Sequence, residues 1–170
     1  FGPIEDGTRT VTDGGSDRVL VLNPVAGTGN HVAEVRSRAA EHGFEVRETE
    51  SEGDAVEFAR EAAASGASIV AAAGGDGTLN EVVRGIREAG KLGDVTFAVV
   101  PAGTGNNFAS NVGISGIADA FRAIERGEVR EIDVGLANDD LFVNSCVAGL
   151  TADASAATDS EMKARLGVLA

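Results

Sequence analysis

Three glycine-rich segments hold most of the residues in this chain that could bind a charged ligand. They are NPVAGTGN at 23–30, GGDGT at 74–78 and PAGTGNNFA at 101–109. Each follows a short apolar run, as a loop after a buried strand does. Glycine lets the backbone approach a ligand closely, and the free N–H groups at the start of a helix favour an anion. Phosphate is therefore the ligand that the three segments predict.

Asp76 is not explained by phosphate binding alone, because a carboxylate repels phosphate. It fits if a divalent metal ion or a substrate hydroxyl lies between the two groups. The alternative is a turn aspartate that bonds its own local backbone. Thr78 and Glu81 have the T-x-x-E spacing of a capping box, which predicts that Thr78 caps the following helix.

The other two segments leave alternatives open. Thr104, Asn106 and Asn107 offer hydroxyl and amide groups to a phosphate or a ribose, but a turn followed by an Asn cap would use the same residues. Gly27-Thr28-Gly29 resembles the start of a dinucleotide fingerprint. Its third glycine would fall at Val32, so a dehydrogenase is disfavoured.

The histidines and the cysteine offer little chemistry. His31 and His42 have no Cys or His partner at ligand spacing, so no zinc site is predicted and both are expected at the surface. Cys146 lies in an apolar segment and is expected in the core. A single cysteine also excludes an internal disulfide.

The elements that must position the three loops follow from hydrophobic periodicity. Strands are predicted at Arg18–Asn23, Phe44–Glu50, Ala67–Ala73 and Val95–Val100. Helices are predicted between them and at Ile117–Arg126, and Ser51 with Asp54 provides a further capping signal. This alternation predicts an α/β fold, a Rossmann-like three-layer domain with a parallel sheet covered on both faces. The three loops would then share the carboxyl edge of that sheet, where ligands bind.

The end of the chain has a different character. VREIDVGLA and LFVNSCVAGL, around NDD at 138–140, predict an antiparallel hairpin, which is marginal alone. We therefore expect a flexible N-terminal tail at 1–17, a nucleotide-binding α/β domain at 18–128, and the first hairpin of an incomplete β-rich second domain at 129–170. The exposed hairpin edge after Glu131 makes a homo-oligomer one option.

The charge excludes some partners. The net charge is −13, with 27 acidic against 14 basic residues. Such a surface argues against nucleic acid and against electrostatic docking on anionic lipid, and it favours a cytosol of high salt, where self-repulsion is screened. No segment is long and apolar enough to span a membrane, so a cytoplasmic location is expected.

NPVAG, GGDGTLNEVV and PAGTGNNFA, in this order and spacing, resemble the catalytic domain of the diacylglycerol kinase family, which includes bacterial lipid kinases and is related to sphingosine and ceramide kinases. GGDGT alone is shared with NAD kinases. The resemblance runs from about Arg18 to the C-terminus. It implies transfer of the γ-phosphate of ATP, with Mg²⁺, to the hydroxyl of diacylglycerol or a related lipid. It also implies transient contact of the full-length protein with the membrane surface.

The resemblance also implies roles for individual residues. Asp76 would be catalytic, joining a metal–water network or orienting the acceptor hydroxyl. The nucleotide would be contacted by Asn23, Pro24, Val25, Ala26, Gly27, Thr49, Gly74, Gly75, Asp76, Gly77, Thr78, Leu79, Asn80, Glu81, Thr104 and Asn106.

Two departures from the family limit what is expected. Asn107 stands where many members have Asp. Most of the β-rich second domain, with further metal-site residues, a general base and much of the lipid cleft, has no counterpart in this chain. We therefore expect the chain alone to transfer phosphate to lipid poorly. An NAD kinase-like enzyme and a stand-alone nucleotide-binding or regulatory module are the alternatives.

Overall fold

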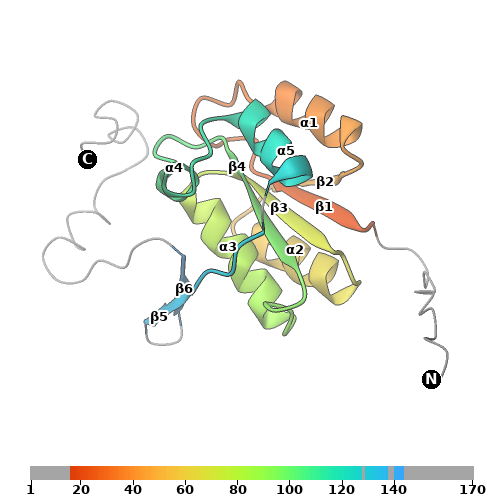
Figure 1. Cartoon of the computed structure of the whole chain (residues 1–170), viewed down its shortest axis with the longest axis vertical. Helices are drawn as coiled ribbons and strands as arrows, with labels where there is room; N and C mark the ends of the chain where they lie inside the picture. The colour runs from red at the N-terminus through yellow and green to blue at the C-terminus, as the bar shows by residue number, and fades with distance from the viewer. Residues whose placement is uncertain (1–15, 128, 138–139, 144–170) are drawn as a thin grey trace, which may run out of the picture.

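The predicted alternation of strands and helices is present in the structure. The computed structural model describes residues 16–127, 129–137 and 140–143 (Figure 1). In chain order the elements are β1 (Arg18–Leu22), α1 (Val32–Glu41), β2 (Glu45–Glu48), α2 (Asp54–Ala64), β3 (Ile69–Gly74), α3 (Asp76–Glu88), β4 (Thr96–Pro101), α4 (Asn107–Asn111), α5 (Ile117–Arg126), β5 (Gly135–Ala137) and β6 (Asp140–Phe142).

The first four strands form one parallel sheet in the order β2-β1-β3-β4. The α/β fold class predicted from the sequence is therefore confirmed. β1 and β3 pair in register from Arg18 opposite Ile69 to Leu22 opposite Ala73. Because all four strands point the same way, the loops that follow β1, β3 and β4 leave at one edge of the sheet.

The central strands β1 and β3 are buried on both faces, which is why they read as continuous apolar runs, whereas β2 at the edge of the sheet is mostly polar and partly exposed. Val19 and Val21 of β1 pack with α2 and α3, whereas Leu20 and Leu22 pack with α1 and α5. All four are at most 1% exposed. Figure 1 shows the same arrangement, with α1 and α5 on one side of the sheet and α2 and α3 on the other.

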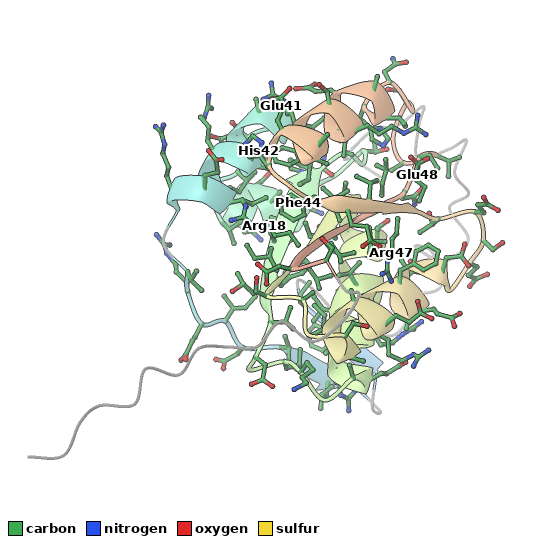
Figure 2. All side chains as sticks on the ribbon, turned by 90° about the vertical axis from the view of Figure 1, so that its right-hand side faces the viewer. Arg18, Glu41, His42, Phe44, Arg47 and Glu48 are labelled. Atoms are coloured by element: carbon green, nitrogen blue, oxygen red, sulfur yellow. The ribbon has the colours of Figure 1, made fainter. Side chains whose placement is uncertain are left out.

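His42 corrects one expectation from the sequence. It was expected at the surface, but its side chain is only 15% exposed, and its ring packs edge-on against Phe121 of α5 with the ring centroids 5.0 Å apart. Figure 2 shows His42 close to Arg18 and Phe44. An Nη atom of Arg18 donates to the His42 carbonyl at 3.3 Å, and its guanidinium lies over the Phe44 ring. The His42 imidazole is mostly buried because it follows the end of α1 and packs against Phe121 in the core.

The predicted capping signal at Ser51 and Asp54 is only half realised. α2 begins at Asp54, after Gly53, and the Ser51 side chain makes no capping bond. The Asp54 carboxylate instead accepts the N–H groups of Glu50 and Ser51, each at 2.8 Å. The acid therefore closes the turn before the helix, because Gly53 has a left-handed φ of 91° that starts the helix later than the spacing suggested.

β5 and β6 pair antiparallel, from Gly135 opposite Phe142 to Ala137 opposite Asp140. The predicted hairpin is therefore present, and its first strand, at Gly135–Ala137, is shorter than expected. Residues 1–15, most of the predicted second hairpin strand and Cys146 lie outside the described residues. Within the described ranges, no helix has the length and apolar character needed to cross a membrane.

Helices α2 and α3 approach closely at Gly85, which gives a test of the packing. A Cβ on Gly85 would meet the Val56 carbonyl oxygen, and would lie 2.9 Å from the Cβ of Ala59. We predict that Gly85→Ala lowers the free energy of unfolding by about 1–3 kcal/mol, because the helices must separate. Urea denaturation measures this change.

Gly77→Ala is the matched control for that experiment. It lies in the same helix, and no atom lies within 4 Å of its added Cβ. It should leave stability unchanged or raise it by up to about 1 kcal/mol, as alanine favours helix over glycine. Equal effects of the two variants would contradict the close approach of α2 and α3.

Candidate functional site

The three glycine-rich loops meet at the carboxyl edge of the sheet and form one cleft. The cleft has a volume of about 350 Å³. Residues from all three loops and from the first turns of α3 line it: Asn23, Ala26, Gly27, Gly75, Gly77, Thr78, Glu81, Gly103 and Thr104. The prediction that the loops share one edge is therefore met by direct contact between them.

Two glycines allow the loops to touch. Gly27 has a φ of +56°, and a Cβ there would lie 2.7 Å from the Ala102 carbonyl oxygen. A Cβ on Gly103 would meet the Cα of Gly75 and lie 2.8 Å from its nitrogen. A side chain at either position would push the loop after β4 away from its neighbours. Gly103 lines the cleft and was not among the predicted site residues, although its place in PAGTGNN was the available signal.

Asn23 ties the first loop to α3. Its Nδ2 donates to the Thr78 Oγ1 at 3.2 Å, and its Oδ1 accepts the Val25 N–H at 3.1 Å. Its carbonyl oxygen lies 3.0 Å from Nε2 of His31. His31 is only 9% exposed, so the expectation that it lies at the surface is wrong. The buried imidazole contacts the Asn23 carbonyl and so helps to hold the first loop in place.

Thr78 does not cap α3, which corrects the predicted capping box. α3 begins at Asp76 after an extended Gly75, and no side chain caps it. Thr78 is inside the first turn and 5% exposed, so its hydroxyl meets Asn23 instead of the helix terminus. The first helical bond runs from Leu79 N–H to the Gly75 carbonyl. The N–H groups of residues 76–78 therefore have no acceptor within the helix and are available to an anion.

Asp76 makes a contact that neither sequence interpretation included. Its Oδ2 accepts the Asn107 N–H and its Oδ1 accepts the Phe108 N–H, both at 3.0 Å. These are the first N–H groups of α4, so a residue of one loop caps the helix that follows another. Its negative charge is met by the positive end of α4. A carboxylate oxygen has a second lone pair, so these bonds leave room for a metal-bound water.

Asn106 fixes the loop after β4 from within. Its backbone is left-handed, with a φ of 51°. Its Oδ1 accepts the Gly103 N–H at 2.9 Å and its Nδ2 donates to the Gly103 carbonyl at 2.7 Å. The amide that was predicted to contact a nucleotide is therefore engaged with its own loop, and the exposed Thr104 beside it lines the cleft.

Among the residues that the structure describes, the cleft carries a negative side chain and no positive one. Glu81 lines it, whereas no Lys or Arg is among its lining residues. Burial raises the pKa of the Glu81 carboxyl, Arg84 partly offsets this rise, and Glu52 adds to it. Positive potential at the cleft must therefore come from backbone N–H groups or from a bound cation.

The other predicted site residues do not line the cleft, although they lie near the same edge. Leu79 is 2% exposed and belongs to the core, so its side chain faces away from a ligand. The Thr49 N–H bonds the Leu22 carbonyl at 2.9 Å, which holds Thr49 beside the end of β1. The other predicted site residues that do not line the cleft are Pro24, Val25, Gly74, Asp76, Asn80 and Asn106. No contact in the structure tests their binding of a nucleotide.

Fold and cleft together define an α/β protein whose ligand cleft is built from backbone loops at the carboxyl edge of a parallel sheet. The chain belongs to the diacylglycerol kinase catalytic domain family, because the model of that family matches residues 17–137. The resemblance stated from the three motifs is therefore confirmed.

Individual relatives agree with the family. The chain is 35% identical over 154 residues to the "Probable lipid kinase YegS-like" of Chromohalobacter salexigens, covering 89% of this chain and 50% of that protein. It is 35% identical over 158 residues to the diacylglycerol kinase of Bacillus subtilis, covering 89% and 52%. A crystal structure of a diacylglycerol kinase from Bacillus anthracis superposes with a TM-score of 0.67 at 27% identity, covering 92% and 53%. The chain thus spans about half the length of these relatives.

The cap on α4 can be tested by removing the Asp76 carboxylate. We predict that Asp76→Ala lowers the free energy of unfolding by about 1–2 kcal/mol, because two N–H groups lose their acceptors. Asp76→Asn keeps one acceptor oxygen and should lose less. Urea denaturation measures stability, and the amide proton shifts of Asn107 and Phe108 report the bonds directly. Asp94→Ala is the control, since its Lys91 ion pair is exposed and contributes little. Unchanged amide shifts in Asp76→Ala would rule out the cap.

Glu81 predicts a pH dependence of stability. Burial raises its pKa above the ordinary 4.5, so the folded state holds the proton more tightly than the unfolded state. This contribution is present at low pH and is lost as the pH rises through the folded pKa. Glu81→Gln removes it, so the stability of the variant relative to the natural chain should increase as the pH is raised from 4 to 7. Thermal unfolding across this range gives the comparison, and a constant difference would contradict it.

Proposed function

We propose that the chain binds ATP with Mg²⁺ in this cleft and forms the nucleotide-binding half of a lipid kinase. The observation that carries the proposal is the meeting of three loops around the unbonded N–H groups of residues 76–78. Membership of the diacylglycerol kinase catalytic domain family supports ATP as the phosphate donor. Diacylglycerol or a related lipid is the proposed acceptor, and the full-length protein would contact the membrane surface transiently.

The cleft residues suit a nucleotide that arrives with a cation. Backbone N–H groups of the first turn of α3 would hold phosphate oxygens, and Gly103 and Thr104 would close the cleft from the loop after β4. The absence of Lys and Arg from the lining leaves the phosphate charge unbalanced. Mg²⁺ would neutralise it, with Glu81 and a water on Asp76 as oxygen ligands of the kind this ion prefers.

The proposed reaction is phosphoryl transfer. The oxygen of a lipid hydroxyl forms a bond to the γ-phosphorus while the bond from that phosphorus to the bridging oxygen breaks. ADP leaves with the electron pair, and the hydroxyl proton passes to a base. The chain contributes alignment, which is the main requirement of such a reaction. We propose Asp76 to orient the hydroxyl or a metal-bound water, and we assign the base and the lipid cleft to none of the described residues.

Binding and transfer can be tested separately. The 170-residue chain should bind MgATP by calorimetry and transfer little phosphate to any lipid. The full-length gene product should transfer the labelled γ-phosphate of ATP to diacylglycerol or to a sphingoid base in mixed micelles. Transfer to NAD in place of lipid would favour the NAD kinase-like alternative. MgATP binding without transfer by the full-length protein would favour a binding or regulatory module.

A variant tests whether the cleft itself binds the nucleotide. Gly103→Ala should raise the Kd for MgATP by about tenfold or more, because its Cβ meets Gly75 across the cleft. Gly93→Ala is the matched control, since it lies at the other end of the sheet with no atom within 4 Å of its Cβ. Equal affinity of the two variants would place the nucleotide elsewhere.

A further inference from the structure

Asn80 links α3 by a side-chain hydrogen bond to the residue directly after the hairpin. Its Oδ1 accepts the Val143 N–H at 3.1 Å, across 63 residues of sequence. Asn80 does not line the cleft, although its neighbour Glu81 does. The residue that the family resemblance assigned to the nucleotide therefore meets the chain directly after β6.

Apolar packing surrounds this hydrogen bond. Leu141 of β6 is 7% exposed, and Val143 packs against the same core cluster as Leu79 and Val82 of α3. The Phe142 ring covers Gly135 of β5, where a Cβ would meet the ring. The hairpin is thus held by its second strand against α3. The bond to Asn80 satisfies a partly buried N–H group that would otherwise lack an acceptor.

The segment that leads to the hairpin does less to fix it. Val129 and Ile132 are 78% and 50% exposed, and Leu136 of β5 is 56% exposed. This connection and the first hairpin strand therefore present apolar side chains to solvent. The contact at Asn80 therefore adds to the packing of Leu141 and Val143 in holding the second hairpin strand against α3. It is one residue from Glu81, at the wall of the phosphate cleft.

We propose that Asn80 is a positioning residue, which fixes the hairpin and Val143 directly after it relative to the phosphate cleft. The proposal rests on the proposed function, because its consequence is the alignment of an acceptor-bearing segment with the nucleotide. The family members that this chain matches are about twice its length. Asn80 would thus set the position of Val143 beside α3 without touching the nucleotide.

The test uses Asn80→Ala, Asn80→Asp, which keeps an acceptor oxygen, and Glu88→Ala, an exposed control at the far end of α3. In the 170-residue chain, the hydrogen-exchange rate of the Val143 amide should rise by about tenfold or more in Asn80→Ala. In Asn80→Asp this rate should stay close to that of the unsubstituted chain, and in Glu88→Ala it should not change. The Kd for MgATP should change by no more than about twofold in all three, as no cleft residue is altered. In the full-length gene product, kcat should fall in Asn80→Ala at unchanged KM for ATP, with recovery in Asn80→Asp.

Two results would overturn the proposal. Unchanged Val143 exchange in Asn80→Ala would show that the bond does not hold the hairpin. A loss of MgATP affinity in Asn80→Ala that matches its loss of activity would make Asn80 a nucleotide contact instead. If the natural chain does not bind MgATP at all, the proposed function fails, and the Val143 exchange rates alone then decide whether Asn80 positions the hairpin.

Discussion

The carboxylate of Asp76 is the contact on which the arrangement of the cleft depends. It joins the start of α3 to the start of α4 by accepting the N–H groups of Asn107 and Phe108. The loop after β4 is therefore held against the loop after β3, with Gly103 against Gly75. The same contact explains how an acid is compatible with a loop proposed to bind phosphate. The negative charge of Asp76 faces the positive N-terminal end of α4, and the first N–H groups of α3 remain available to an anion.

The proposed anion site relies on backbone N–H groups. No basic side chain of the described residues lines the cleft, and Glu81 adds a carboxylate whose pKa is raised by burial. A nucleotide would thus be bound best together with a cation, which balances both the phosphates and the acid. The net charge of −13 agrees with this design, because an acidic protein gains selectivity for a small metal-bound anion over nucleic acid, whose many phosphates need many cations. Binding of this kind would be sensitive to the free concentration of the cation.

The chain spans about half the length of the relatives it matches, and its described part ends in a hairpin held against α3. The N-terminal half of α3 makes both contacts. Its first turn faces the cleft, and Asn80 in its second turn accepts the N–H of Val143, directly after β6. One helix therefore relates the cleft to the end of the hairpin, and under the proposed function it would align the nucleotide with the chain after the hairpin.

The sequence by itself determined the layers, the parallel sheet and the edge where the loops lie. These follow from periodicity and from glycine, which are local properties, and the predicted bounds of Ile117–Arg126 match α5. Only the tertiary structure decided which partner each polar side chain takes. Asp76 meets N–H groups 31 and 32 residues away, and Thr78 meets Asn23, 55 residues away, instead of capping its helix. Such choices depend on which groups the folded backbone brings within about 3 Å, and no pattern along the chain encodes that distance.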